Sequence, residues 1–283
     1  MSFFTTYSRK LENLIAVVIF LITFAVYFST MAPTVSFWDT GEFIATSHIL
    51  GVPHPPGSPL FLLVGKFFSL IPISSDIAYR VNIFSPIISA LTISLLFLIC
   101  NQFIDRVEPK DSNKFFKMWS SLTASLTFAF THSHWFNAVE TEVYAFSGFM
   151  TALVIYLIMR WSEKMHNSDH VIYLIFISYI IGLATGLHLL NLLTIPFIGL
   201  IIYFSIGKIS TKNLILTITL SLISFFGIQS FIIQGLPQIT ASIGLIGLML
   251  LIISLIAFTV YSIKSRKAFS SIFLSSALLI IIG

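Results

Sequence analysis

Apolar runs alternate with short polar segments along the whole chain. The runs lack the strict alternation that marks a barrel strand, and most are long enough for a membrane-spanning helix of about 20 residues. The fifth and sixth runs are continuous. We divide them at Gly186 and His188 because a single helix of that length would be about twice as long as the bilayer is thick. The predicted apolar helices are residues 14–31, 84–103, 118–130, 143–159, 171–187, 189–206, 214–233, 239–263 and 269–283.

The composition supports an all-α, polytopic transmembrane protein with about nine spans. Hydrophobic residues make up 57% of the 283 residues and charged residues 9%, whereas a soluble domain carries roughly 25% charged residues. We treat residues 1–283 as a single transmembrane domain. The last apolar run ends without a polar anchor, so we expect a further C-terminal part to be missing from this chain.

The basic residues predict the orientation in the membrane. If the N-terminus lies in the cytoplasm, all 15 lysine and arginine residues except Lys66 and Arg80 fall in inner segments, as the positive-inside rule requires. The net charge of +4 is spread over these short loops and therefore does not indicate nucleic-acid binding. The outer face then holds most of the unusual polar residues.

The first predicted outer loop, residues 32–80, combines acidic residues with a proline-rich segment. Six of the ten prolines fall within it. Prolines on both sides of His54 restrict its backbone and should hold its ring in one direction. The apolar stretch 58–71 is too short for a span, and it predicts either an interfacial helix on the outer leaflet or a re-entrant element.

Asp39 and Glu42 are the first candidate pair in this loop. Residues three apart on a helix share one face, so the two carboxylates can act together as base and orienting group, or bind a divalent cation. The alternative is structural: Asp39 caps a helix, and Glu42 lies favourably in its first turn. We expect the neighbouring Phe37, Trp38 and Phe43 to shield the pair from water and raise a carboxylate pKa.

The second outer loop contains two histidines followed by Glu140, Glu142 and Tyr144. The spacing matches no strong metal-ligand motif, and helix capping with interfacial anchoring by aromatic residues accounts for most of it. We therefore predict no definite metal site here.

The last outer feature is the turn between the fifth and sixth runs, where His188 and Asn191 are three residues apart. They can face one cavity, although a single histidine at a helix turn is more often structural. Arg80 is the outer cation best suited to a phosphate group; its alternative role is an interfacial anchor.

Four segments resemble one protein family: WDTGEF, GVPHPPGSPL, the run from Trp135 that includes AVETEVY, and GLHLLN. They are similar to the bacterial branch of the membrane protein O-mannosyltransferase-like family of the GT-C glycosyltransferase superfamily. The similarity covers about residues 10–205. The matching segments are residues 38–43, 51–60, 135–144 and 186–191.

The resemblance implies a GT-C-like helical fold and transfer of a sugar, such as mannose, from a polyprenyl-phosphate carrier to a protein or envelope acceptor. The implied location is the bacterial inner membrane, with the active site facing outward. On this basis we expect Asp39 to be the catalytic base and Glu42 to orient the acceptor or help hold a cation. His54 or Arg80 would stabilise the leaving phosphate.

The remaining candidates would line the sugar or carrier pocket: Glu140, Glu142, Tyr144, His188 and Asn191. The alternative function is a transporter or flippase for a lipid-linked or amphiphilic solute. A transporter would place ionisable groups near mid-span, whereas these candidates gather at one face.

Overall fold

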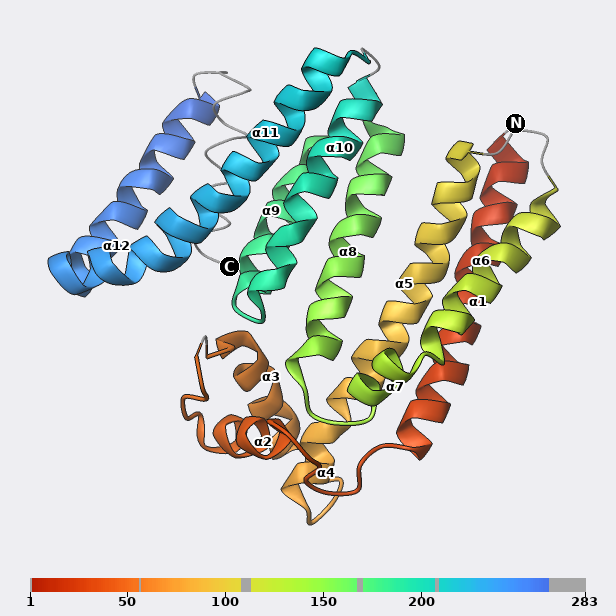
Figure 1. Ribbon diagram of the computed structural model, residues 1–283, viewed down its shortest axis with the longest axis horizontal. Coiled ribbons are helices and arrows are strands. Elements are labelled where there is room, and N and C mark those ends of the chain that lie inside the picture. The colour runs from red at the N-terminus through yellow and green to blue at the C-terminus, as the bar shows by residue number, and fades with distance from the viewer. Residues whose placement is uncertain (1, 56, 108–112, 167–169, 207–208, 265–283) are drawn as a thin grey trace. The chain divides into compact units, whose positions relative to one another are not determined.

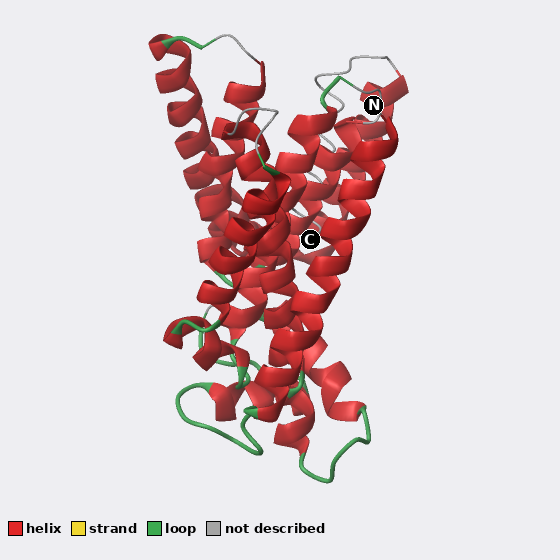
Figure 2. Ribbon diagram, turned by 90° about the vertical axis from the view of Figure 1, so that its right-hand side faces the viewer, coloured by secondary structure: helices red, strands yellow, loops and turns green. Residues whose placement is uncertain are grey.

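The computed structural model describes residues 2–55, 57–107, 113–166, 170–206 and 209–264. Within these ranges the chain folds into helices and loops, with no strand (Figure 2). Figure 1 labels most of the helices along the chain. They are α1 (Ser2–Ser29), α2 (Thr40–Ile49), α3 (Pro59–Leu70), α4 (Ile77–Asn82), α5 (Phe84–Val107), α6 (Lys114–Ala129), α7 (His132–Ala138), α8 (Val143–Lys164), α9 (His170–Thr185), the 3-10 helix η1 (Leu189–Leu193), α10 (Thr194–Ile206), α11 (Thr211–Gly227), the π-helix η2 (Ile228–Gln234) and α12 (Gly235–Lys264).

The helices confirm an all-α, polytopic membrane protein. By length and apolar composition, five stretches of the described chain could cross a membrane: Arg9–Ser29, Ile77–Val107, Val143–Lys164, Leu189–Ile206 and Thr211–Ser254. The predicted runs 118–130 and 171–187 form helices α6 and α9 of 16 residues each. The runs 214–233 and 239–263 fall in consecutive helical segments, and the run 269–283 lies outside the described residues.

The chain divides into two compact units. The first comprises residues 1–156 with 186–188, and the second comprises residues 157–185 with 189–283. Below, they are called unit 1 and unit 2.

In unit 1, helices α1, α5 and α6 pack side by side (Figure 1). Their shared core includes Ile19, Tyr27, Ile93 and Phe97, each at most 2% exposed. The Tyr27 hydroxyl donates a hydrogen bond to the Ala129 carbonyl at 2.8 Å. This bond satisfies a polar group that would be costly to bury unpaired.

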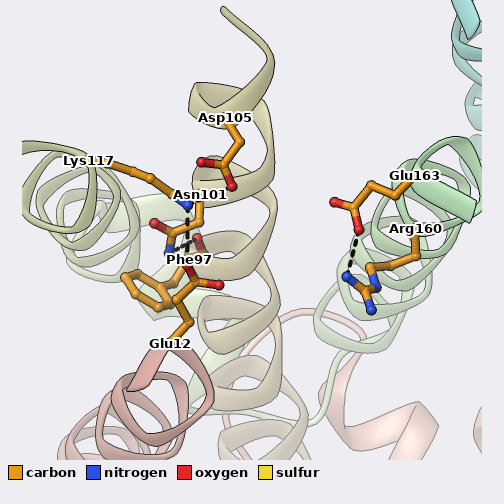
Figure 3. A network of polar contacts seen from close by, with 7 residues as sticks. All are labelled: Glu12, Phe97, Asn101, Asp105, Lys117, Arg160 and Glu163. Atoms are coloured by element: carbon orange, nitrogen blue, oxygen red, sulfur yellow. Dashed lines mark hydrogen bonds and ion pairs between the residues drawn. The ribbon is translucent and has the colours of Figure 1, made fainter. Parts of the chain in front are cut away.

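A charged network joins the same three helices where α1 begins and α5 ends (Figure 3). The buried Lys117 ammonium on α6 lies 3.2 Å from a Glu12 carboxylate oxygen and 2.6 Å from one of Asp105. Figure 3 also draws Arg160 and Glu163 of unit 2, an ion pair at 2.7 Å within α8.

The loop between α1 and α5 is itself folded into the short helices α2, α3 and α4 (Figure 1). Asp76 caps α4, because its carboxylate accepts hydrogen bonds from the backbone N–H of Ala78 and Tyr79. Helix α3 packs closely on α2: a Cβ at Gly65 would lie 2.4 Å from the Ser47 hydroxyl oxygen. The predicted short helix at 58–71 is therefore confirmed as α3, and its relation to the bilayer stays a prediction.

In unit 2, α10 and α11 pack together around a similar small-residue contact. A Cβ at Gly199 would lie 2.1 Å from the Ser221 hydroxyl oxygen, so glycine is needed for this approach.

Candidate functional site

Asp39 immediately precedes α2, in the N-cap position. The residue before it, Trp38, has a φ of 60°, a left-handed conformation that is uncommon for a bulky side chain. The Asp39 carboxylate makes no capping hydrogen bond and is exposed. Asp39 therefore occupies the N-cap position that the structural alternative predicts, but its side chain does not cap the helix.

Glu42, in the first turn of α2, is engaged with His54 of the proline-rich segment. One carboxylate oxygen accepts the His54 backbone N–H at 2.7 Å, and the other lies 2.6 Å from His54 Nδ1. These bonds lower the pKa of Glu42 and raise the pKa of His54. The pair therefore favours a carboxylate beside an imidazolium, with the ring held in one orientation.

The expected aromatic shield over this pair is wrong for two of its three members. Phe37 and Trp38 are each 83% exposed, because they lie in the loop before α2 rather than on its packed face. Phe43 is buried, with its ring centroid 5.7 Å from that of His54. The environment of Asp39 is consequently open to solvent.

Glu140 and Glu142, in the loop between α7 and α8, are both buried, at 4% and 5% exposure. Ser36 donates its hydroxyl to one oxygen of Glu140 at 2.5 Å. The second oxygen of Glu140 and one oxygen of Glu142 have no hydrogen-bond partner in the described chain. Burial raises the pKa of Glu142 to about 7, with further contributions from the negative charges of Asp39 and Glu140.

These acidic residues come from two loops far apart in the sequence and act on one another electrostatically. The charges of Asp39 and Glu142 both raise the pKa of His54, although its bond to Glu42 is the largest cause. Side-chain ligand atoms of Asp39, Glu42 and His54 all lie within 4.8 Å of one another. These three groups could hold a metal ion, although Glu42 and His54 already bind each other.

Tyr144 and His188 are also brought together in unit 1, with ring centroids 5.4 Å apart. The turn that carries His188 contacts the proline-rich segment: Ser58 donates to the Leu187 carbonyl at 2.9 Å, and Leu60 N–H donates to the Gly186 carbonyl. Partial burial lowers the pKa of His188, which favours the neutral ring.

Two predicted residues have contacts elsewhere. Arg80 donates to the carbonyls of Ser74 at 2.5 Å and Ser69 at 3.1 Å, and so supports the loop before α4. Asn191 belongs to unit 2, where its side chain donates to the Ala184 carbonyl at 3.0 Å. Their predicted contacts with a ligand stay predictions.

Sequence reasoning missed the polar residues that join the two acidic loops: Ser36, Asn82 and Thr141. Asn82 and Thr141 are completely buried. The sequence offers one hint, which is that Asn82 stands at the start of an apolar run. A polar side chain buried there needs hydrogen-bond partners.

Comparisons with known proteins indicate the family of the chain. The family model described as "Protein O-mannosyl-transferase TMEM260 N-terminal domain" matches residues 39–212. Protein O-mannosyl-transferase tmem260 of Dictyostelium discoideum is 26% identical over 230 residues, covering 77% of this chain and 26% of that protein. The Mus musculus protein O-mannosyl-transferase TMEM260 is 30% identical over 149 residues, covering 52% of this chain and 20% of its own length. The chain thus spans about a quarter or less of these relatives. No solved structure matches.

Proposed function

The chain belongs to the TMEM260 N-terminal domain family, and we propose that it is the catalytic part of a glycosyltransferase that moves a sugar onto a hydroxyl of a protein acceptor. The donor we propose is a sugar, such as mannose, linked to a polyprenyl phosphate. The relatives' names support the protein acceptor and the mannosyl group. The membrane-spanning helices suit a donor held in lipid.

The observation that carries the proposal is the state of the Asp39 carboxylate. It is exposed and makes no capping bond, while the neighbouring acids are engaged or buried. Glu42 is bound to His54, Glu140 accepts the Ser36 hydroxyl, and Glu142 is buried. Asp39 is therefore the carboxylate best placed to accept a proton from an incoming hydroxyl group.

In the proposed step, the acceptor oxygen attacks the anomeric carbon of the sugar and its proton passes to Asp39. The bond between that carbon and the phosphate oxygen breaks, and the polyprenyl phosphate leaves with the electron pair. His54, oriented and kept protonated by Glu42, donates a hydrogen bond to the departing phosphate.

The buried acids and the aromatic pair would bind the sugar. Glu140 and Glu142 have buried oxygens without described partners; sugar hydroxyls would donate hydrogen bonds to them once the loop between α7 and α8 opens. Tyr144 is half exposed beside His188 and offers a ring face to the sugar.

A divalent cation at Asp39, Glu42 and His54 is a second source of positive charge for the phosphate. A cation bound through His54 Nδ1 would have to replace the proton shared with Glu42 at 2.6 Å, whereas one bound through Nε2 would leave that contact in place. We take His54 itself as the source of positive charge, because its bond to Glu42 raises its pKa.

The site is proposed to face outward from a bacterial inner membrane, with the N-terminus in the cytoplasm. This orientation rests on the lysine and arginine distribution, which leaves few basic residues beside the acidic loops.

The test is transfer of radiolabelled mannose from a polyprenyl phosphate to an acceptor protein by the purified full-length protein. Replacing Asp39 by Asn should lower the rate at least about 100-fold, the usual contribution of a general base. Its thermal unfolding should not change, because the side chain is exposed and makes no capping bond.

Asp76→Asn is the matched control, because it makes the same change in the same loop and asparagine can still cap α4. Its transfer rate should stay near that of the wild type. Near wild-type transfer by Asp39→Asn would contradict the role of Asp39 as the general base.

A further inference from the structure

Asn82, the last residue of α4, connects three separate segments of unit 1. Its side-chain nitrogen donates to the carbonyls of Ala32 at 2.9 Å and Thr34 at 3.0 Å, both in the loop before Asp39. Its side-chain oxygen accepts the hydroxyl of Thr141, which lies between Glu140 and Glu142. A single buried amide thus bonds to both acidic loops.

The bonding pattern fixes the orientation of this amide. Both hydrogens of the Asn82 nitrogen are used by backbone carbonyls, which can only accept. The oxygen therefore faces Thr141, whose hydroxyl must donate. Both residues are completely buried, so losing any one of these bonds would leave a polar group unpaired away from water.

Other contacts between the two loops are few in the described chain. The backbone N–H of Ala32 donates to the Val139 carbonyl at 2.8 Å, and Ser36 donates to Glu140. The loops belong to parts of the sequence about 100 residues apart, so these contacts help to set the separation of Asp39 from Glu142.

We propose that Asn82, together with Thr141, is a positioning residue that holds the Asp39 loop against the Glu140–Glu142 loop so that their carboxylates form one site. The effect on transfer rests on the proposed function. The clamp, by which we mean the hydrogen bonds of Asn82 to Ala32, Thr34 and Thr141, does not. Loss of the clamp would leave each carboxylate in place on its own segment and change only their relative position.

The first measurement is steady-state transfer by the full-length protein carrying Thr141→Val, a replacement of similar shape that removes the hydroxyl. We expect kcat to fall roughly tenfold, because a small misplacement of catalytic groups is costly, while KM for the donor changes less than about twofold. Thr141→Ser keeps the hydroxyl and should restore kcat. Asn82→Ala should lower kcat further, because it also frees two carbonyls.

Asn101→Ala is the matched control. Asn101 is also buried, lies on α5 and donates to the Phe97 carbonyl, but it lies near the other end of the span that contains Asn82. The Asn101→Ala substitution removes a buried amide without touching either loop, so kcat per folded molecule should stay at the wild-type value.

The second measurement is amide hydrogen exchange of Ala32, whose N–H donates to the Val139 carbonyl across the two loops, and it needs no activity. Exchange should be faster in Thr141→Val and Asn82→Ala by roughly tenfold and unchanged in Asn101→Ala. Unchanged exchange in both clamp variants would overturn the proposal, and so would faster exchange with undiminished kcat. If the wild type shows no transfer but exchange is still faster in the two clamp variants than in the wild type, the clamp is supported and the proposed function is overturned instead.

Discussion

Unit 1 contains two polar clusters at opposite ends of its packed helices, and they differ in charge balance. In the cluster where α1 begins, the Lys117 ammonium lies between the carboxylates of Glu12 and Asp105. The side-chain atoms without a described partner nearby, such as Asn101 Oδ1, are neutral amide or hydroxyl groups.

In the cluster that follows α1, four carboxylates share one histidine. Glu42 is paired with His54, but buried oxygens of Glu140 and Glu142 lack described partners, and Asp39 makes no capping bond. An arrangement with unbalanced buried charge is unfavourable for stability. The cluster in which both carboxylates contact a cation, called the balanced cluster below, is therefore best explained by folding, and the unbalanced one by function.

The largest expected effect is on stability, and it comes from the balanced cluster. Lys117→Met should destabilise the protein by about 3 kcal/mol, the usual cost of breaking a buried pair, because it leaves the largely buried Glu12 carboxylate without its cation. Asp105 adds little to this cost, since its side chain is 59% exposed. Thermal unfolding in detergent measures this change. The transfer rate per folded molecule should stay near the wild-type value, and its loss would contradict the division between the clusters.

The next effect is a pH dependence that arises from Glu142. Its folded pKa of about 7 lies above the ordinary carboxyl value of 4.5, so the folded state binds more protons between these pH values. Wild-type stability should therefore fall as pH rises through this window.

Replacing Glu142 by Gln removes the titration. The unfolding free energy of the variant minus that of the wild type should therefore increase from pH 4 to pH 8 by on the order of 2 to 3 kcal/mol. A constant difference that does not depend on pH adds to this change. Unfolding curves at several pH values test it. A difference that is the same at every pH would show that Asp39, Glu140 and burial do not act on Glu142 as described.

Much of this arrangement follows from local sequence. The apolar runs predicted the main helices, and the three-residue spacing of Asp39 and Glu42 predicted two carboxylates at the start of one helix. Each of these properties depends on residues close together in the chain.

The unpredicted properties depend on long-range contacts or on a single backbone angle. The left-handed φ of Trp38 precedes Asp39, and both Phe37 and Trp38 are exposed instead of covering it. The bonds from Asn82 to Thr141 and from Ser36 to Glu140 join residues 59 and 104 positions apart. Spacing along the sequence carries no information about such pairs.

Two glutamates allow a direct comparison of the clusters by the same replacement. Glu42→Gln removes the charge that orients His54, so transfer should fall roughly tenfold, with little change in unfolding because the pair is exposed. Glu12→Gln weakens the Lys117 network and should lower thermal stability without changing transfer per folded molecule. Transfer assays and unfolding curves should therefore show lost transfer with unchanged stability for Glu42→Gln, and lost stability with unchanged transfer for Glu12→Gln. The same result for both variants would contradict the assignment of one cluster to function and the other to folding.

The smallest expected effect is that of a chelator. A cation bound by Asp39, Glu42 and His54 would balance the second cluster and make it resemble the first. The 2.6 Å contact between Glu42 and His54 favours a proton at that position, so EDTA followed by gel filtration should change transfer by less than about twofold. If transfer is lost and returns with added Mn²⁺, the positive charge for the phosphate is a metal ion, because histidine and carboxylate ligands suit such ions. In that case Glu42→Gln and His54→Gln should weaken Mn²⁺ binding, while Glu12→Gln should not.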